Sequence, residues 1–412
     1  MGWENFDPVR VGKQLEDLAL IGKTEEGGTT RLAFTPADIQ AKEYVKKLML
    51  EAGMVTYYDP VGNLIGVYEG LNPEMPGIIM GSHLDTVPNG GKYDGIAGVL
   101  VAVEIVRTFF LSGHRFKPNI TVVAFADEEG VRFGGSLFGS RAMTGLLSPE
   151  WLERTDEQGI KLKKAMTDCG FNPANFEQAK IDPAKFKAYF ELHIEQGRIL
   201  EKADCPIGLV LGISAPSQLW ATIRGRADHA GATPMGERKD ALAAAAELIL
   251  AVEKICTPKE GQVTVGTVGS ISVQPNALNV IPGEVRMSLD IRDIDINLRN
   301  QAIEGIKESA QEIALRRGID ISLEETLAIE PVILDQNLIN ALEQVCQKIG
   351  LTYKKLISGA GHDAMLMAKI IPSAMIFVRC RDGISHSPDE FAQIEDLYLG
   401  AKLLYHTIGS LL

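Results

Sequence analysis

The sequence predicts an α/β protein in which a mixed β-sheet forms one domain and a second, two-layer α/β domain is inserted into the first. A strand, a helix and another strand follow one another between residues 77 and 126, an order that indicates a βαβ unit and hence a parallel or mixed sheet. Residues 284–292 instead alternate apolar and polar side chains, as expected of an antiparallel strand with one face towards solvent. At 412 residues, the chain exceeds one ordinary compact core, so two domains, or one domain with a large insertion, are expected.

The first domain is expected to alternate helices with short apolar strands. Gly77–Ser82 (GIIMGS) is an apolar run that ends in small residues, which is typical of a buried strand. The turn-rich passage Pro88–Gly95 leads into Ile96–Leu111, whose length and composition suit a buried helix. The remaining elements expected here are a first helix at Pro36–Gly53 and strands at Asn119–Ala126, Ala188–Leu192 and Ile371–Val378.

The middle of the chain predicts a separate two-layer α/β unit. Its apolar residues recur at strand spacing in Glu284–Arg292 and at helical spacing before Gly318, which stands where a C-terminal helix cap would lie. A second helix is expected at Ala241–Ile255 and another strand at Leu219–Arg224. We therefore expect an inserted domain at residues 214–329, between the two parts, 1–213 and 330–412, of the first domain. The residues that carry the two patterns are Val285, Met287, Leu289 and Ile291 in the strand, and Ile303, Ile306, Ala310 and Ile313 in the helix.

Composition and charge narrow the classes of function. The net charge of −13 disfavours nucleic acid or an anionic membrane as a partner, because such binders present basic patches. The apolar runs fall short of the roughly 20 residues that a membrane-spanning helix needs. Met1–Arg10 lacks a basic stretch followed by an apolar block, which argues against a signal peptide. A cytoplasmic location is therefore expected. The five cysteines show no CxxC spacing and cannot all pair within one chain, so we expect reduced thiols.

Histidines and carboxylates follow the predicted strands of the first domain. His83 comes directly after the GIIMGS strand, and Asp94 lies in the glycine-rich turn before the next helix. Open α/β sheets bind ligands beyond the carboxyl ends of their strands, where loops gather side chains. Asp85 is placed to orient the His83 ring without itself binding the ligand. By itself, this His-x-Asp pattern is more typical of an ordinary polar loop than of a binding site.

Adjacent glutamates, Glu128 and Glu129, follow the strand NITVVAFA. At the end of a buried strand such a pair is costly unless a cation or a proton lies between the carboxylates; the alternative is a solvated acidic turn. His193 follows the strand near Ala188, and His386 comes late in the chain. Imidazole and carboxylate ligands without thiolate suit Zn, Mn, Co or Ni.

The motifs SHLDTVPNGGKYDG, DEEGVRF, HIEQG, DHAGATPM, NVIPGE and ISHSP together resemble the co-catalytic di-metal exopeptidase and aminoacylase superfamily, in its hydantoinase/carbamoylase branch. The resemblance runs in order from about residue 80 to 390. His193 supports the branch, since related exopeptidases usually carry an acidic ligand there. The resemblance implies a phosphorylase/hydrolase-like di-metal domain whose inserted domain acts as a lid and pairs in a homodimer.

The resemblance also implies a role for each residue. One divalent metal would bind His83 and His193, the other Glu129 and His386, with Asp94 bridging both. Glu128 would remain free as the general acid and base.

Recognition of the substrate is implied for a further set of residues. His229 matches a lid histidine that stabilises the developing oxyanion, and Arg292 matches a residue that binds the substrate carboxylate. Gln196 and Asn279 match amides that bind polar groups of the substrate, while Gly361 and His362 lie in a pocket-lining segment. The ordinary alternatives are a surface-loop histidine, a turn-forming Asn and a surface Gln.

The activity implied is hydrolysis of the N-carbamoyl (ureido) group of N-carbamoyl-L-amino acids to L-amino acid, carbon dioxide and ammonia. Allantoate is the rival substrate, since it also presents a ureido nitrogen beside a carboxylate. A dipeptidase or aminoacylase is less compatible with His193. A catalytically inactive binding protein would lack a ligand or the base, whereas every expected position is filled. His114 and His406 lie in helix-end contexts that suit structural roles.

Overall fold

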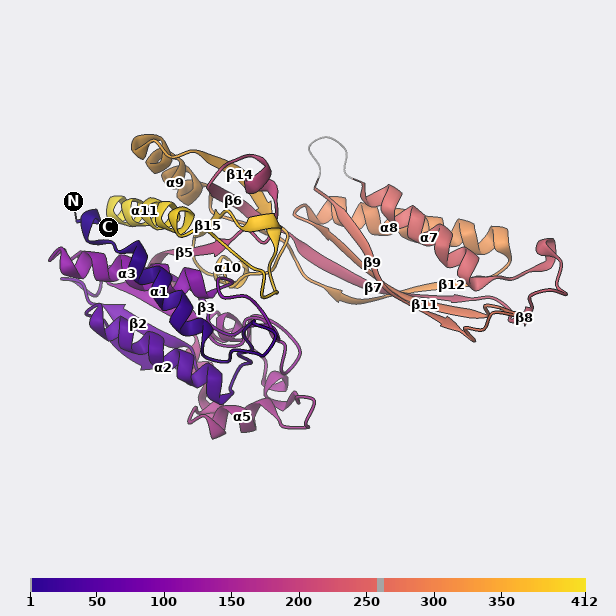
Figure 1. The fold of residues 1–412 in the computed structure, drawn as a ribbon, viewed down its shortest axis with the longest axis horizontal. Coiled ribbons are helices and arrows are strands. Elements are labelled where there is room, and N and C mark those ends of the chain that lie inside the picture. The colour runs from indigo at the N-terminus through magenta and orange to yellow at the C-terminus, as the bar shows by residue number, and fades with distance from the viewer. Residues whose placement is uncertain (1, 258–262) are drawn as a thin grey trace. The chain divides into compact units, whose positions relative to one another are not determined.

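A computed structural model describes residues 2–257 and 263–412, and it divides the chain into two compact units (Figure 1). Unit 1 contains the residues up to Leu211 together with Leu334–Ser358 and His362–Leu412. Unit 2 contains Gly212–Ile333 and Gly359–Gly361. Of the N-terminal segment considered above, Met1 lies outside the described residues. The predicted mixed α/β class is confirmed.

A nine-stranded mixed sheet organises unit 1, although its short edge strand at residues 332–333 is counted with unit 2. β3 pairs in parallel with both β4 and β5, and β5 pairs in parallel with β15, whereas β2 and β6 join this central set antiparallel. The order is β1-β2-β4-β3-β5-β15-β6-β13, with β14 also paired to β6. The strands are β1 (Val55–Tyr58), β2 (Leu64–Tyr68), β3 (Gly77–His83), β4 (Ile120–Phe125), β5 (Phe186–Ile194), β6 (Ile207–Ile213), β13 (Val332–Ile333), β14 (Tyr353–Ser358) and β15 (Ser373–Val378).

The predicted βαβ unit is confirmed as β3, α3 (Ile96–Leu111) and β4. Every residue of β3 is buried, as its apolar run requires, because helices cover both faces of the sheet. Ile78 and Met80 pack with the helices of one face, and α4 and α10 contact strands from the other. The remaining helices of unit 1 are α1 (Pro8–Ala19), α2 (Pro36–Glu51), α4 (Phe138–Met143), α5 (Leu162–Asp168), α6 (Ile199–Lys202), α9 (Gln336–Ile349), α10 (Ala364–Met367) and α11 (Ile394–Leu411).

The expected first helix, at Pro36–Gly53, is α2, and a further helix that was not expected, α1, precedes it. Its signals were present in the sequence. Asp7 caps the helix by accepting a hydrogen bond from the backbone N–H of Arg10, and Pro8 stands at its first turn. Val11, Leu15 and Leu18 are buried at helical spacing against the core of unit 1.

Unit 2 contains a four-stranded antiparallel sheet in the order β12-β7-β11-β9, covered on one face by α7 and α8 (Figure 1). The predicted alternation is confirmed, since Val285, Met287, Leu289 and Ile291 of β11 are all buried under these helices. A separate two-stranded ribbon joins β8 to β10. The elements are β7 (Ala215–Arg224), β8 (Asp228–His229), α7 (Ala241–Cys256), β9 (Val265–Gln274), β10 (Val280–Ile281), β11 (Glu284–Asp293), α8 (Ile296–Arg317) and β12 (Asp320–Ala328).

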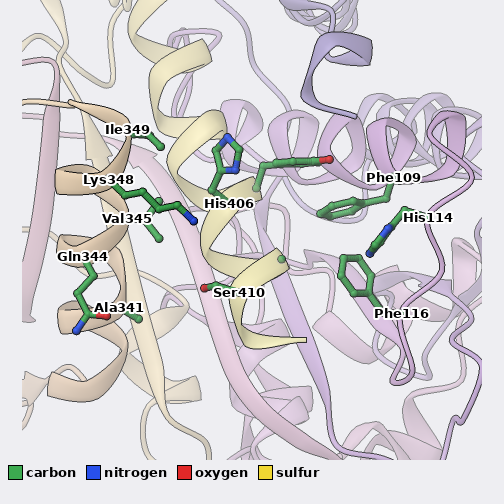
Figure 2. A pocket seen from close by; sticks show the side chains of 12 residues that line it. Phe109, His114, Phe116, Ala341, Gln344, Val345, Lys348, Ile349, His406 and Ser410 are labelled. Atoms are coloured by element: carbon green, nitrogen blue, oxygen red, sulfur yellow. The ribbon is translucent and has the colours of Figure 1, made fainter. Parts of the chain in front are cut away.

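A cavity of about 640 Å³ lies in unit 1 between α9, α11 and the C-terminal end of α3 (Figure 2). Phe109, Phe116 and Lys348 line it, together with His114 and His406. None of its lining residues lies at the carboxyl ends of the central strands. These two histidines are therefore separate from the candidate site described below.

The expectations about cysteines and about membrane-spanning helices concern features of the described residues. All five cysteines lie among them and are free thiols. Within residues 2–257 and 263–412, the helices include none with the length and apolar composition needed to cross a membrane.

The two glycines of α8 yield a stability prediction. Gly318, the expected C-terminal cap, is left-handed at φ 62° and ψ 40°, so an alanine there would make only an ordinary 3.9 Å contact with Lys239 but would strain the backbone. We expect Gly318→Ala to lower the free energy of unfolding by about 1 kcal/mol. Gly305→Ala, inside the same helix, should raise it by roughly 0.5–1 kcal/mol, because its Cβ would make only an ordinary 3.7 Å contact with Ile255. Denaturant unfolding measures both, and changes of the same sign would contradict this assignment.

Candidate active site and metal centre

The carboxyl ends of the central parallel strands bring together the predicted histidines and glutamates of unit 1. His83 is the last residue of β3, and His193 is the penultimate residue of β5. Glu128 and Glu129 follow β4, and His386 lies in the loop after β15. Because β3, β4, β5 and β15 are parallel, their carboxyl ends meet at the same edge of the sheet.

Asp94 lies between two groups of side chains. Its Oδ1 is 3.5 Å from His83 Nε2 and 3.1 Å from His193 Nε2. Its Oδ2 is 3.4 Å from His386 Nε2, which is itself 3.5 Å from Glu129 Oε1. Each group could hold an ion, since its three ligand atoms lie within 4.8 Å of one another. The geometry thus provides two neighbouring groups of possible ligands that share one carboxylate.

Backbone carbonyls orient the two buried imidazoles. His83 Nδ1 lies 3.0 Å from the carbonyl oxygen of Asp85, and His193 Nδ1 lies 2.9 Å from that of Ile194. A carbonyl only accepts hydrogen bonds, so both Nδ1 atoms donate; in the neutral tautomer that this sets, each Nε2 lone pair faces Asp94, and a protonated ring would instead donate to Asp94 there. The backbone N–H of Gly95 donates to His193 Nε2 at 3.1 Å, which agrees with this tautomer.

Asp85 contacts His83 through a different group from the one expected. Its main-chain carbonyl, rather than its carboxylate, makes the close contact with His83, because the nearest carboxylate oxygen is 3.8 Å from Nδ1. The carboxylate instead accepts hydrogen bonds from the backbone N–H groups of Glu128 and Glu129, at 3.1 and 3.0 Å. Asp85 therefore orients the His83 ring and the segment that carries both glutamates.

Burial and mutual repulsion shift the pKa values of the acidic side chains. Burial raises the pKa of Glu128 well above its usual value, with Glu129 and Asp363 adding to the effect and His83 opposing it. Burial is also the main cause that raises the pKa of Glu129 to about 7. Burial acts on Asp94 in the same direction, but the surrounding His193, His386 and His83 outweigh it and hold its pKa well below the usual range.

This donor set fits divalent cations. Carboxylates crowded in a buried site are stabilised by a nearby positive charge, and imidazole with carboxylate oxygen suits Zn, Mn, Co or Ni. His386 is the most accessible member, with 49 % of its side chain exposed. Glu128 Oε2 is 3.7 Å from His83 Nε2, and a set of His83, Glu128 and Glu129 is also close enough to hold an ion. These distances are therefore compatible with Glu128 as either a general base or a metal ligand.

Gln196 and His362 lie beside this cluster in unit 1. Gln196 donates its amide N–H to Asp94 Oδ2 at 2.6 Å, while its amide oxygen is buried without a hydrogen-bond partner among the described residues. His362 is buried, contacts Ser358 Oγ at 2.8 Å and packs edge-on against the His193 ring. Burial and the neighbouring His193 lower its pKa well below the usual value. Gly361 belongs to unit 2 and has open space where a side chain would lie.

Three other predicted residues belong to unit 2. His229 in β8 pairs with Val280 of β10, and the carbonyl oxygen of Asn279 accepts a hydrogen bond from the Ala230 N–H, so one ribbon carries His229 and Asn279. His229 Nδ1 accepts hydrogen bonds from two backbone N–H groups at 3.0 Å, which leaves the ring proton on Nε2.

Arg292 lies on another element of unit 2, the strand β11. Two of its guanidinium nitrogens donate to the Asp290 carboxylate at 2.7 and 3.2 Å, and a third donates to the Gly359 carbonyl at 2.8 Å. The guanidinium is therefore held in a defined orientation while remaining partly exposed.

Two buried glutamates that the sequence analysis did not single out contact this site. Glu191 accepts hydrogen bonds from Ser82 Oγ at 2.8 Å and from the Ala364 N–H at 2.9 Å. Its place two residues before His193 on a buried strand was the available signal. Glu390 accepts a hydrogen bond from the Asp94 N–H, and it follows His386 closely in the sequence.

Known proteins share this sequence and fold. A model of peptidase family M20/M25/M40 matches residues 79–410. The chain is 45% identical to an N-carbamoyl-L-amino acid amidohydrolase of Geobacillus stearothermophilus, with 98% of each chain covered. It is 44% identical to an N-carbamoyl-L-amino-acid amidohydrolase of Pseudomonas sp. (strain NS671), with 97% of each covered.

Two further similarities bear on the branch. An allantoate amidohydrolase of Bacillus subtilis (strain 168) is 37% identical, over 95% of this chain and 94% of its own. The crystal structure of an amidase of the hydantoinase/carbamoylase family from Burkholderia multivorans superposes with a TM-score of 0.92, at 33% identity and 98% coverage of each chain. The chain therefore belongs to peptidase family M20/M25/M40, a metal-dependent hydrolase family, and within it to the hydantoinase/carbamoylase branch.

Proposed function

We propose that this protein hydrolyses the N-carbamoyl group of N-carbamoyl-L-amino acids, releasing the L-amino acid, carbon dioxide and ammonia. The observation that carries the proposal is the position of Asp94 between the His83–His193 pair and the Glu129–His386 pair. The names of the two relatives at 44% and 45% identity support the same substrate class.

Two divalent ions, Zn, Mn, Co or Ni, are proposed for these groups. His83 and His193 would hold one, Glu129 and His386 the other, and Asp94 would bridge them, which agrees with the two ligand groups that share this aspartate. When bound, such a pair polarises a substrate carbonyl and lowers the pKa of a shared water molecule.

Glu128 is proposed as the general base and then the general acid. It takes a proton from the attacking water and delivers it to the nitrogen that leaves as the C–N bond breaks. Its burial raises its pKa, so the carboxyl can hold that proton between the two steps. The hydrogen bonds from its own and the next backbone N–H to Asp85 hold this segment in place for both transfers.

Residues of both units are proposed to bind the substrate. Arg292 would bind the carboxylate, and His229 would donate its Nε2 proton to the developing oxyanion. Asn279, Gly361 and His362 are proposed to line the pocket. The buried amide oxygen of Gln196, which has no hydrogen-bond partner within residues 2–257 and 263–412, is suited to accept a ureido N–H.

The domain roles and the assembly belong to the same proposal. Residues 1–213 and 330–412 would form the catalytic domain, and 214–329 a lid that also forms a homodimer. β9 is an edge strand of the unit 2 sheet, and its Val265 and Ile271 are exposed by 52% and 46%. An exposed apolar edge is a natural surface for pairing with a second copy. We also propose a cytoplasmic location, with no nucleic acid or membrane partner.

Allantoate remains the second candidate substrate, because a relative named for it is 37% identical across most of both chains. It carries a carboxylate and a ureido carbonyl, so the same residues would serve it. A dipeptidase or aminoacylase activity is disfavoured because Gln196 and Asn279 carry no charge to hold a free ammonium.

The first prediction concerns the metals. Chelation should abolish activity, and Mn, Co, Ni or Zn should restore it. Glu128→Gln should retain the metal content of the wild type, because Glu128 is proposed not to be a ligand, while lowering turnover by roughly 10²–10⁴-fold. Metal analysis and kinetics test this, with Glu157→Gln as an exposed control. Loss of metal from the Glu128 variant would exchange the roles of Glu128 and Glu129.

The second prediction separates two residues of unit 2. Arg292→Ala should mainly raise KM, by roughly 10- to 100-fold, because the carboxylate is bound in the ground state and the transition state alike. His229→Ala should mainly lower turnover, by roughly 10²–10³-fold, because only the transition state carries the oxyanion. Arg286→Ala removes an exposed arginine from the same strand and should change neither constant.

Indistinguishable kinetics for Arg292→Ala and His229→Ala would contradict these roles. Mixing inactive Glu128→Gln and His229→Ala subunits then tests whether His229 acts in the partner's site, since complementary mixed dimers would regain activity. Mixed dimers without activity would place His229 in the site of its own subunit.

The third prediction concerns the substrate. N-carbamoyl-L-methionine should be cleaved well, its D-enantiomer hardly at all, and an ordinary dipeptide poorly. With the carboxylate held by Arg292 and the ureido carbonyl held at the metal centre, only one enantiomer can direct its side chain into the remaining space. The measurement is kcat/KM for these three and allantoate on one metal-loaded preparation. Preference for allantoate would change the substrate but not the mechanism, whereas preference for the dipeptide would contradict the substrate class.

A further inference from the structure

Glu390 is a buried carboxylate that contacts the turn carrying Asp94. Only 3% of it is exposed. Its Oε1 accepts hydrogen bonds from the backbone N–H groups of Tyr93, at 2.7 Å, and of Asp94, at 3.1 Å. Both donors precede α3 in a turn without regular secondary structure, where their N–H groups have no strand or helix partner. One carboxylate oxygen therefore fixes the main chain of the residue proposed to bridge the metals.

The other oxygen of Glu390 reaches the loop that carries His386. Its Oε2 lies 2.8 Å from Ser385 Oγ, and the same hydroxyl lies 2.6 Å from Asp94 Oδ2. Because the hydroxyl has one proton, the two carboxylates share a single hydrogen-bond donor. Glu390 thus contacts the backbone of Asp94 directly. It reaches the Asp94 side chain by way of Ser385, the residue immediately before His386.

The local backbone shows that this arrangement is closely packed. A Cβ atom at Gly91 would overlap the Glu390 carboxylate, so the absence of a side chain at Gly91 lets the turn approach it. His386 has a φ of 56°, in the left-handed region that residues other than glycine seldom adopt. Such a conformation persists where the surroundings hold it, and the contacts of Ser385 provide that support.

We propose that Glu390 is a positioning residue that sets the geometry of Asp94 relative to His386, and thereby the spacing of the two metal sites. The inference rests on the proposed metal centre. It does not make Glu390 a ligand, because Glu390 belongs to none of the groups of described side chains that lie close enough together to hold an ion. Side chains that orient metal ligands typically change metal affinity about 10- to 100-fold when they are removed.

Three variants separate positioning from charge and from folding. Glu390→Ala removes all three hydrogen bonds. Glu390→Gln retains an oxygen for the two backbone N–H groups and an amide N–H for Ser385, while it removes the charge. Ser385→Ala keeps the two backbone contacts and removes only the link to Asp94 Oδ2. Asp335→Ala is the control, since it removes a carboxylate cap from α9, a helix remote in sequence from these loops.

The experiment titrates Co²⁺ into the chelator-treated full-length protein and follows the visible absorption of the bound ion, which reports affinity and coordination geometry. Thermal unfolding is measured on the same samples. We expect Glu390→Ala to weaken Co²⁺ binding by about 10- to 100-fold and to alter the spectrum. Glu390→Gln should restore binding and spectrum close to wild type, and Ser385→Ala should lie between. Asp335→Ala should lower the unfolding temperature without changing either.

Each other result has a defined meaning. Tight Co²⁺ binding with an unchanged spectrum in Glu390→Ala would overturn the role of Glu390 while leaving the metal centre in place. Weakening by Glu390→Gln as large as by Glu390→Ala would assign the effect to charge and overturn positioning. An equal loss in Asp335→Ala would show general loosening of unit 1 and overturn it as well. If Glu390→Ala does not fold, the spectra of Glu390→Gln and Ser385→Ala decide by the same criteria. Wild type without saturable Co²⁺ uptake would overturn the metal centre and this inference together.

Discussion

The arrangement of unit 1 depends on one constraint, which is that a single carboxylate, Asp94, contacts three imidazoles at once. His83 and His193 face one of its oxygens and His386 the other. These histidines come from two strands and a loop that are far apart in the sequence, so the contact requires a parallel sheet whose strand ends coincide. The side chains around Asp94 are buried, so a negative charge there is costly unless a positive charge balances it. This explains why the donor set suits cations.

Further hydrogen bonds hold the residues around Asp94 in these positions. Backbone carbonyls hold the tautomers of His83 and His193, and Asp85 holds the segment of Glu128 and Glu129 through two backbone N–H groups. Glu390 has the corresponding relation to the turn of Asp94. The two carbonyls thus orient side chains at the ends of strands, and the two carboxylates bind backbone N–H groups on loops, where no strand or helix would otherwise satisfy them.

The two units present different kinds of polar groups, according to their architecture. Unit 1 presents ionisable groups at the ends of buried strands, where low polarity strengthens their interactions. Unit 2 is an antiparallel sheet with helices on one face, and it carries His229, Asn279 and Arg292 on a ribbon and a strand whose polar sides face outward.

Short-range pattern in the sequence was sufficient for the βαβ unit, for the bounds of α3 and for the alternating strand β11, because burial on one or both faces dictates which side chains are apolar. Motif resemblance selected the residues that gather around Asp94. Tertiary structure alone decided that the Asp85 carbonyl orients His83, that the Gln196 amide donates to Asp94, and that Glu390 holds the Asp94 turn. The last contact joins residues 296 positions apart. Local sequence carries no record of such a pairing, because it exists only once the sheet has brought its strand ends together.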